Sequence, residues 1–338
     1  DNIQSDTGQL SGIQTAGALR LKSGKYEFRE DDVLYSKIRP YLNKVTIPGF
    51  RGVCSADIYP LRVREERLSR HFLVYLLRSE RFLRYAASQS TRTNIPKINR
   101  PALLAFEVEL PRLAEQKRIA AILDKADAIR RKRQEAIALT EEFLRSAFLD
   151  MFGDPVTNPK GWEVKPFGEL ATNVDSDRIP LKKADRANRQ GEYRYFGASG
   201  AIDTIDDYLF EGAHLLIAED GANLLARSTP VAFRVSGRFW VNNHAHVVRE
   251  NGQAELCFLE TFFSLISLRK WITGSAQPKL NRKKLDSIPV PLPPSALQSR
   301  FRSIADTHAG LGARFNHGIQ DSQNLFNALV QRAFRGKI

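Results

Sequence analysis

The sequence predicts an α+β protein with two mixed α/β domains, a long antiparallel two-helix coiled coil between them and a pseudo-two-fold internal repeat. Three observations favour this fold class: the length of 338 residues, a segment that recurs 182 positions later, and a long helical pattern at the rear of each copy. A chain of this length favours two domains. Its 42% hydrophobic and 26% charged residues are typical of a globular protein with an ordinary core.

The repeat is the strongest signal in the sequence. Residues 96–124 and 278–306 are identical at 13 of 29 positions, and both copies begin with the motif Pro-Lys-x-Asn-Arg. Gln116 and Gln298 are among the matched pairs. Upstream of this segment the two halves differ in sequence and in length. Each copy therefore has a variable front and a shared rear, as expected of a duplicated unit.

The rear of each copy has the pattern of a long helix. After Pro111, apolar residues recur at helical spacing at Ile119, Ile122, Ala126 and Ile129. After Pro294, the same spacing joins Leu297, Phe301, Ile304, His308, Leu311 and Phe315. We interpret the Ile and Phe positions of both helices as core. Gly153 and Gly336 are suitable stop signals for the two helices.

Both apolar stripes need a partner, so we expect the two helices to pair antiparallel. A helix of about 35 residues is about 50 Å long, which would hold the two front domains apart at opposite ends of the pair. The helix endings Ser146–Phe148 and Arg332–Phe334 match at an offset of 186, so the second helix is about one turn longer. If the helices set the distance between the two front domains, removing about four residues from the second one should move those domains by about 6 Å.

The fronts have the pattern of mixed α/β domains. Short runs rich in β-branched or aromatic residues predict strands at 32–36, 53–60, 213–218, 231–235 and 239–241. Helices are predicted at 70–77 and 256–264. The predicted domains are 1–111, the central helix 112–152, the second front domain 153–294 and the last helix 295–338. Because residue 1 aligns near 183, we expect the first front domain to lack about twenty residues that open the second one.

Charge and cysteine content restrict the function. The 51 Lys and Arg residues against 38 Asp and Glu give a formal net charge of +13, which favours a nucleic-acid partner. Cys54 and Cys257 stand alone in apolar strand-like stretches, so we expect buried free thiols and a reducing cytoplasm. Neither a membrane-spanning run nor a signal peptide is found, so we expect no membrane association and no secretion.

Three segments together resemble one known family. They are Pro111–Lys125, which reads Pro-Arg-Leu-Ala-Glu-Gln-Lys-Arg-Ile-Ala-Ala-Ile-Leu-Asp-Lys, the helix exit Phe148–Asp154, and Gly161-Trp162 followed by Phe167–Leu170. A degraded form of the first recurs at Pro293–Phe301. Over nearly the whole chain the sequence resembles the specificity (S) subunit of type I restriction-modification systems.

The resemblance implies a DNA-binding specificity subunit that is not itself an enzyme. In that family two variable target-recognition domains each read one half of a split site in double-stranded DNA. The conserved helices set the gap between the half-sites and dock the methyltransferase (M) subunits, and through them the restriction (R) subunits. The resemblance thus implies a cytoplasmic restriction system whose catalysis lies in the partner subunits.

Motifs for catalysis are weak. We find no glycine-rich phosphate loop and no Asn-Pro-Pro-Tyr-like loop for adenine methylation, so no cofactor is predicted. Glu163–Lys165, after Asp150 and Asp154, resembles part of a metal nuclease site, but we favour an ordinary strand. His244 and His246 could bind a metal from one strand face, yet a third ligand of suitable spacing is missing. We therefore predict neither a catalytic nor a metal site.

Candidate DNA-contacting residues in the first domain lie in two groups. The first places cations beside an aromatic ring and comprises Lys37, Arg39, Tyr41, Lys44 and Arg51. The second is a polar loop before the matched segment and comprises Thr91, Arg92, Thr93, Asn94 and Lys97. Such donors can reach phosphates or base edges, but a merely solvated loop explains both groups equally well. The run Arg130–Arg133 is interpreted as a solvated helix face or a phosphate track.

The second domain has analogous candidates. They are Asn223, Arg227, Asn242, Asn243, His244, Gln277 and Lys279. Asn pairs bidentately with adenine and Arg with guanine, each pair worth about 1–3 kcal/mol of discrimination.

Two other functions remain open at this stage. The chain could be a self-sufficient DNA methyltransferase or nuclease, which S-adenosylmethionine binding by the isolated chain would indicate. It could also be a basic helical scaffold that attracts nucleic acid only through its charge. In that case binding would have the same salt dependence for every DNA sequence.

Overall fold

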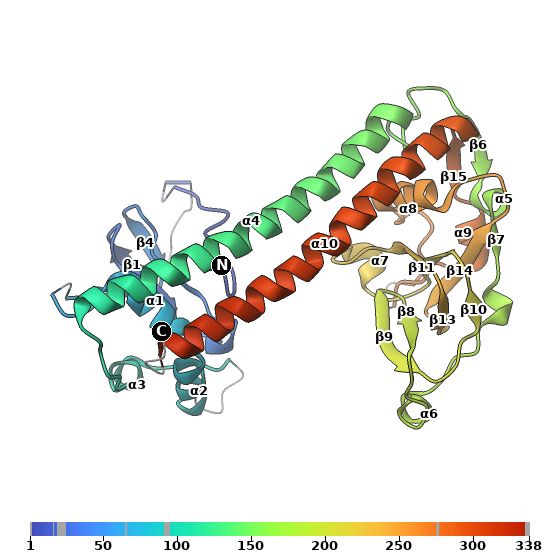
Figure 1. The fold of residues 1–338 in the computed structure, drawn as a ribbon. Coiled ribbons are helices and arrows are strands. Elements are labelled where there is room, and N and C mark those ends of the chain that lie inside the picture. Colours follow the sequence, from blue (N-terminus) through green and yellow to red (C-terminus); the bar gives the residue numbers. More distant parts are fainter. Residues whose placement is uncertain are drawn as a thin grey trace. The chain divides into compact units, whose positions relative to one another are not determined.

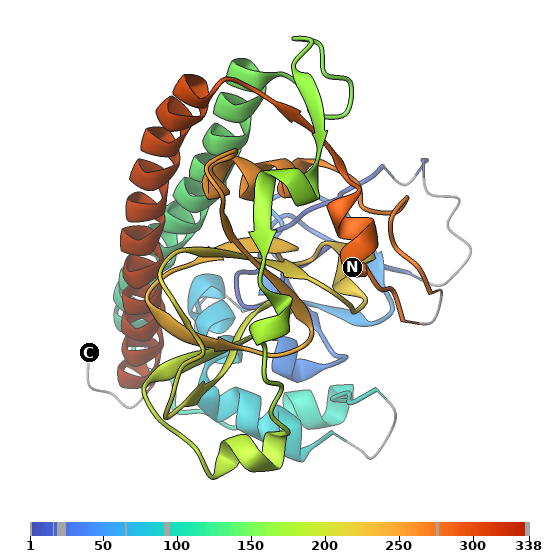
Figure 2. The ribbon, with the colours of Figure 1, turned by 90° about the vertical axis from the view of Figure 1, so that its right-hand side faces the viewer.

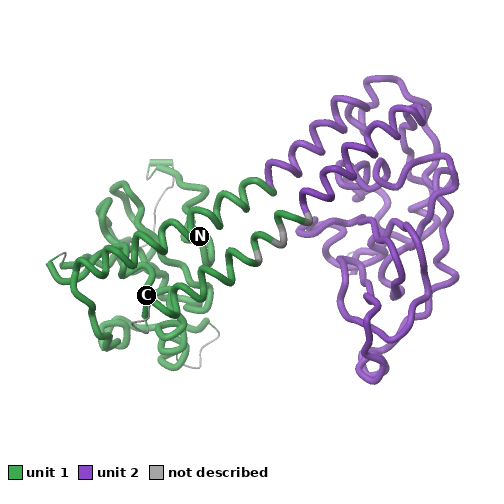
Figure 3. Tube along the Cα trace, viewed as in Figure 1, with its two compact units in different colours: residues 1–137, 314–338 green, residues 138–313 purple. Residues whose placement is uncertain are grey.

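The structure is a computed structural model that describes residues 2–15, 17–18, 25–64, 66–90, 95–274 and 277–334. The chain forms two compact units (Figure 3): unit 1 comprises residues 1–137 and 314–338, and unit 2 comprises residues 138–313. Two long helices, α4 (Leu113–Phe152) and α10 (Ser295–Ala333), each contribute to both units. Of the two predicted cysteine thiols, Cys54 and Cys257, both are free and buried, as expected.

The α/β part of unit 1 consists of two small antiparallel sheets and three helices. One sheet pairs β1 (Lys25–Phe28) with β4 (Gly52–Ser55), and the other has the order β3 (Val45–Thr46), β2 (Val33–Ser36), β5 (Ile58–Leu61). A 3-10 turn, η1, spans Pro40–Leu42, and the helices are α1 (Arg70–Arg78), α2 (Glu80–Ser88) and α3 (Arg100–Leu104). Val33 and Tyr35 of β2 pack against Phe82 of α2 in its core.

The α/β part of unit 2 is larger. A four-stranded sheet has the order β12 (Ala232–Val235), β11 (His214–Ala218), β14 (Ala245–Glu250), β7 (Ala171–Asn173). A second has the order β10 (Phe210–Glu211), β13 (Arg238–Val241), β8 (Tyr193–Gly197), β9 (Gly200–Ile205). Strand β15 (Pro289–Leu292) pairs with β6 (Glu163–Pro166). The short helices are α5 (Phe167–Leu170), η2 (Asp175–Asp177), α6 (Lys183–Ala187), α7 (Asn223–Ala226) and α9 (Arg282–Asp286), and α8 spans Leu256–Leu265.

The two long helices pack against each other in each unit, and Figure 1 and Figure 2 show them side by side. In unit 1, Leu123 near the start of α4 shares a core with Phe326 near the end of α10. In unit 2, Phe148 near the end of α4 packs on Phe301 near the start of α10, with ring centroids 5.5 Å apart. In each unit, the start of one long helix packs against the end of the other, so the two helices run antiparallel. The predicted α+β fold with its internal repeat is confirmed.

Two predictions about the helices were wrong in detail. Ile129 was predicted to lie in the apolar core, yet 51% of it is exposed, because the stripe shifts to Ala126 and Arg130. Arg130 in turn was expected on a solvated face, but it is 1% exposed and its guanidinium bonds Asp127, Gln323 and the Asp6 carbonyl. Paired donors and an ion pair make burial of this cation tolerable.

Candidate nucleic-acid interface

Unit 1 presents a loop that follows strand β2 and is fastened to the repeated motif. The amide of Arg39 donates to the carbonyl of Pro96 at 2.7 Å, and the amide of Ile98 donates to the carbonyl of Lys37 at 3.0 Å. Asn99 then caps α3 by accepting a hydrogen bond from the Ala102 amide. The motif Pro-Lys-x-Asn-Arg therefore holds the loop and starts the next helix.

Unit 2 repeats this arrangement at the same offset of 182 residues. The amide of Gly221 donates to the carbonyl of Pro278 at 3.0 Å, and the amide of Leu280 donates to the carbonyl of Glu219 at 2.7 Å. Asn281 caps α9 through the amide of Lys284, as Asn99 caps α3. The buried backbone of the motif is thus structural, whereas the side chains of both its lysines, Lys97 and Lys279, are exposed.

The predicted residues around the loop of unit 1 divide by exposure. Arg39 has φ 48° and precedes η1, in which Tyr41 is 63% exposed. Arg51 is also exposed, and Lys44 is half-buried. The side chain of Lys37 already has partners within unit 1: its Nζ donates to the Ala56 carbonyl at 2.7 Å and lies 3.6 Å from an oxygen of Asp57.

The structure therefore brings Arg39, Tyr41 and Lys97 to one loop cluster in unit 1, because the backbone of Lys97 forms a β-bridge with that of Ile38. No contact links Arg51 to this cluster within the described residues. The predicted residues Thr91, Arg92, Thr93 and Asn94 lie outside the residues that the structure describes.

Two of the predicted residues in unit 2 have structural partners. The guanidinium of Arg227 donates to the carbonyls of Phe263, Ser264 and Ile266 at the end of α8, at 2.6–3.0 Å. Asn223 closes its own loop: its Nδ2 donates to the Thr229 carbonyl, and its Oδ1 accepts from the Thr229 amide. Both side chains hold backbone in place, and neither is free to contact a base edge without breaking these bonds.

The remaining candidates of unit 2 lie around Asp220. Asn242 is buried and accepts a hydrogen bond from the amide of His244. His244 Nδ1 lies 2.9 Å from both carboxylate oxygens of Asp220, whose backbone forms a β-bridge with Lys279. The Nζ of Lys279 lies 3.2 Å from Glu219 Oε1. Asn243 and Gln277 are exposed. His244, Asn243 and Lys279 thus form the exposed polar part of this loop cluster.

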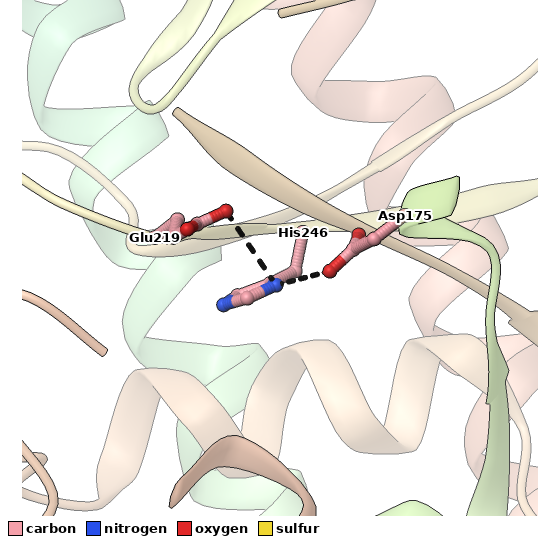
Figure 4. Close-up of side chains that lie close together, drawn as sticks. All are labelled: Asp175, Glu219 and His246. Atoms are coloured by element: carbon pink, nitrogen blue, oxygen red, sulfur yellow. Dashed lines mark hydrogen bonds and ion pairs between the residues drawn. The ribbon is translucent and has the colours of Figure 1, made fainter. Parts of the chain in front are cut away.

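A buried ion cluster lies beneath the loop of unit 2 (Figure 4). His246 Nδ1 lies 2.5 Å from Asp175 Oδ2, and its Nε2 lies 2.7 Å from the carbonyl of Leu280. The guanidinium of Arg178 bonds Glu219 at 2.8 Å and lies 3.5 Å from Asp175 Oδ2. Burial would raise the pKa of Asp175, but hydrogen bonds from His246 and the Val247 amide hold that pKa below its ordinary value.

The cluster has the ligand types of a metal site, since Asp175, Glu219 and His246 offer atoms within 4.8 Å of one another. Its hydrogen bonds favour another interpretation. A carbonyl only accepts, so Nε2 of His246 donates to Leu280; an ionised Asp175 likewise accepts from Nδ1. The guanidinium of Arg178 bonds Glu219 and lies beside Asp175, so both carboxylates already have partners within the protein. The cluster therefore fastens the loop residue Glu219 and the motif residue Leu280 to the sheet.

The repeated loops, the paired helices and the surplus of positive charge all agree with one comparison. The family described as the type I restriction modification DNA specificity domain matches residues 6–139 and 159–320. The chain belongs to this DNA specificity family. The matched family describes a specificity domain, in agreement with the prediction that this chain contributes specificity to a restriction system and no catalysis.

Curated relatives of this specificity protein share parts of its sequence. The EcoDI specificity subunit of Escherichia coli is 38% identical over 156 residues, which cover 44% of this chain and 34% of the relative. The chain thus spans about a third of the length of that relative. The putative MjaX specificity subunit of Methanocaldococcus jannaschii is 24% identical over 315 residues, which cover 83% of this chain and 73% of the relative.

Solved structures show that the fold of the specificity family extends over the whole chain. A crystal structure of a type I restriction-modification S subunit from M. genitalium has a TM-score of 0.62 at 16% identity and covers 96% of this chain and 92% of its own. A chain from a study of complex assembly and conformational transition of the type I system has a TM-score of 0.51 at 19% identity and covers 94% of this chain. In the described residues, every helix is too short or too polar to cross a membrane.

Sequence reasoning missed the supporting residues of the specificity site. Asp175 and Arg178 gave no signal, because they meet Glu219 and His246 only through the fold of the sheet. His246 was named with His244 as a possible metal ligand on one strand face, but the structure buries His246 and exposes His244, so the two histidines do not share a face. The buried partner of a histidine pair of this kind is a structural residue.

Proposed function

We propose that this chain is a DNA sequence-specificity subunit of a cytoplasmic type I restriction-modification complex. Residues 1–111 and 153–294 act as two target-recognition domains that bind the halves of a bipartite site in double-stranded DNA. The helices at 112–152 and 295–338 set the gap and dock the M subunits, and through them the R subunits. The chain itself supplies no catalytic group, cofactor or metal.

The observation that carries this proposal is the repeated loop pair. Two domains that share a fastening motif and differ in the residues around it are suited to reading two different short sequences with one geometry. The net charge of +13 supports contacts with the phosphate backbone in both halves. Family membership supports the assignment of that charge to DNA.

The proposed reading residues of the first domain are Arg39, Tyr41 and Lys97 of its loop cluster. The half-buried Lys44, Arg51 outside the cluster, and the predicted residues Thr91–Asn94, which lie outside the described part of the chain, complete the set. In the second domain they are Asn243, His244, Gln277 and Lys279. Lys37, Asn223, Arg227 and Asn242 act indirectly in this proposal, because their printed hydrogen bonds position the loops.

An apolar groove between the long helices of unit 2 is the proposed docking surface for an M subunit. It has a volume of about 520 Å³ and is lined by Leu139, Thr140, Phe143, Ser303, Ile304, Thr307, His308 and Leu311. Leu139 and Phe143 are 65% and 61% exposed. Exposed apolar side chains of this size on a helix pair indicate a partner helix.

The test is a methylation map of cells that contain the chain and its M subunits. We expect methylation at one split sequence with a fixed gap, and loss of complex formation when Leu139 and Phe143 are both changed to Glu. A double change of the exposed Glu141 and Glu142 to Gln on the same turn is the control. Methylation that showed no preference for any split site would contradict the proposal.

A further inference from the structure

Unit 1 contains a large groove. It has a volume of about 1440 Å³ and is bordered by residues 59–64 on one side and 107–110 on the other. Its floor is apolar and includes Leu73, Leu76, Leu77, Leu103 and Phe106. A groove of this size and composition is unusual on the surface of a finished domain.

Among the described residues, neither border of the groove is paired with a further strand. The sheet of unit 1 ends at β5, whereas the matching sheet of unit 2 continues from β14 to β7. The two sheets correspond residue by residue, because Leu34 pairs with Pro60 as Leu216 pairs with Val247. Within the part of unit 1 that the structure describes, the β5 edge therefore lacks the neighbour that Ala171–Asn173 provides in unit 2.

The opposite border lacks a partner in the same way. Residues Glu107–Leu110 align with β15, which pairs antiparallel with β6 in unit 2. In unit 1 these four residues are not a strand, and their amides make no backbone hydrogen bond within the described part of the chain. An exposed edge of this kind is a template for strand addition.

The floor of the groove corresponds to a filled core in unit 2. There Phe167 and Leu170 of α5 are buried in one cluster with Phe263 and Ile288, and the Phe167 and Phe263 rings lie 5.1 Å apart. Counted from the start of α1 and α8, Phe263 corresponds to Leu77. At the repeat offset, Ile288 corresponds to Phe106. Both counterparts line the groove.

The charge on the groove complements such a segment. Five arginines line it, namely Arg62, Arg64, Arg67, Arg81 and Arg100, against the two glutamates Glu107 and Glu109. Arg62 is paired with Asp32 and Arg81 donates to the carbonyl of Glu107, so the complementary charge of the groove rests on Arg64, Arg67 and Arg100. The stretch Glu163–Asn173 carries two glutamates and one lysine. Double-stranded DNA would satisfy the arginines but leave the apolar floor exposed, so the observations favour a polypeptide occupant.

We propose that this groove is an acceptor site for a polypeptide segment built like Glu163–Asn173. The segment contributes a strand to residues 107–110, one helical turn whose Phe and Leu side chains fill the floor, and a second strand to the β5 edge. Bound in this way it completes both sheets and the core of unit 1. The proposal does not rest on the proposed function, because it follows from the comparison of the two units.

The test uses the whole chain with a copy of residues 153–182 placed directly before Asp1. At the repeat offset this copy arrives in register, since residue 1 aligns with residue 183. We expect amide hydrogen exchange of residues 107–110 and 61–63 to slow about tenfold or more. The matched control carries Phe167→Asp and Leu170→Asp in the added copy only, and it should leave exchange at both edges unchanged.

A second measurement does not depend on the added copy. A labelled peptide of residues 161–173 should bind the unmodified chain saturably, and the double variant Arg64→Glu with Arg67→Glu should weaken that binding about tenfold at low salt. Equal exchange in the added-copy chain and its control, together with no peptide binding, would overturn the proposal. So would protection of both edges by a DNA duplex and not by the peptide.

Discussion

Gln298 occupies in unit 2 the position that Gln116 occupies in unit 1, and both side chains make the same two hydrogen bonds. Gln116 Oε1 accepts from the amide of Ser69, and its Nε2 donates to the Pro111 carbonyl, each at 2.9 Å. Gln298 bonds Glu255 and Pro293 in the same way, at 3.0 and 2.8 Å. Each glutamine thereby joins the start of a long helix to the first turn of α1 or α8.

The first prediction concerns these glutamines. Gln116→Leu or Gln298→Leu should lower the free energy of unfolding by about 1–3 kcal/mol, because each leaves a buried amide and a carbonyl without a partner. Both side chains are fully buried, whereas Gln253 is exposed. The control Gln253→Leu should change stability by less than about 0.5 kcal/mol. Urea unfolding followed by circular dichroism gives the comparison, and a neutral Gln298→Leu would show that the link is not structural.

The second prediction concerns the ion cluster of unit 2. Asp175 has a lowered pKa, so it stabilises the fold above its ordinary pKa of 3.8, and this contribution is lost as the pH falls through the lower folded value. Asp175→Asn should therefore reduce stability at neutral pH. The difference between the two proteins should shrink below about pH 4.

Thermal unfolding at pH 7, 5 and 3 measures this dependence. The neighbouring exposed residue provides the control, Asp177→Asn, which should leave stability unchanged within about 0.5 kcal/mol at each pH. A difference between Asp175→Asn and the unmodified protein that stays constant from pH 7 to pH 3 would mean that the Asp175 charge does not support the cluster.

The sequence predicted the positions that pattern alone determines. The repeat located the loop motif and the paired glutamines, and helical spacing located α4 and α10. The sequence did not predict the hydrogen-bond partners of these residues. Gln116 finds the amide of Ser69, and Arg227 finds carbonyls 36 to 39 residues away, because the fold brings these distant segments together. Arg130 was misplaced for the same reason, since its partners Asp6 and Gln323 come from the two ends of the chain.

The third prediction separates a DNA contact from a structural arginine. Arg39→Asn keeps the left-handed backbone at φ 48° tolerable and removes the cation. It should weaken binding to the methylated target about tenfold and lower the salt dependence by about one counterion if the contact is to a phosphate. Arg145→Gln removes one exposed charge from α4, outside the basic run Arg130–Arg133, as the matched control.

Arg227→Gln should behave in the opposite way. Its guanidinium holds three carbonyls at the end of α8, so the change should lower the melting temperature before it affects DNA affinity. DNA affinity and melting temperature, measured on both Arg39→Asn and Arg227→Gln, distinguish a DNA contact from a structural arginine. An Arg227→Gln protein of normal stability with lost affinity would assign Arg227 to the DNA.

The fourth prediction concerns thiol reactivity. Burial raises the pKa of Cys257 to about 12 and also raises the pKa of Cys54 above its ordinary value. Because the thiolate is the nucleophile, both thiols should resist iodoacetamide at pH 8 in the native protein and react after unfolding. Mass spectrometry counts the modified residues, and rapid native labelling at Cys257 would show that the α8 core opens.

The last prediction concerns the helices as the ruler between the two half-sites. Phe148 follows Gln116 by 32 residues, and Phe334 follows Gln298 by 36 residues. Phe148 packs on Phe258 of α8, and Phe334 packs on Phe72 of α1, so each distance runs between equivalent contacts. Both helices contribute to both units, so shortening only one would strain the pair.

Deleting Gln134–Ile137 and Ala309–Gly312 together removes about one turn, or about 6 Å, from each helix. We expect the methylated sites in cells to keep both half-sequences and to lose about two base pairs of gap, at 3.4 Å each. Deleting Ala309–Gly312 alone should instead destabilise the chain, because the apolar contacts of α10 then fall out of register with those of α4. If the doubly shortened chain methylates sites with the original gap, the spacing is set by something other than these helices.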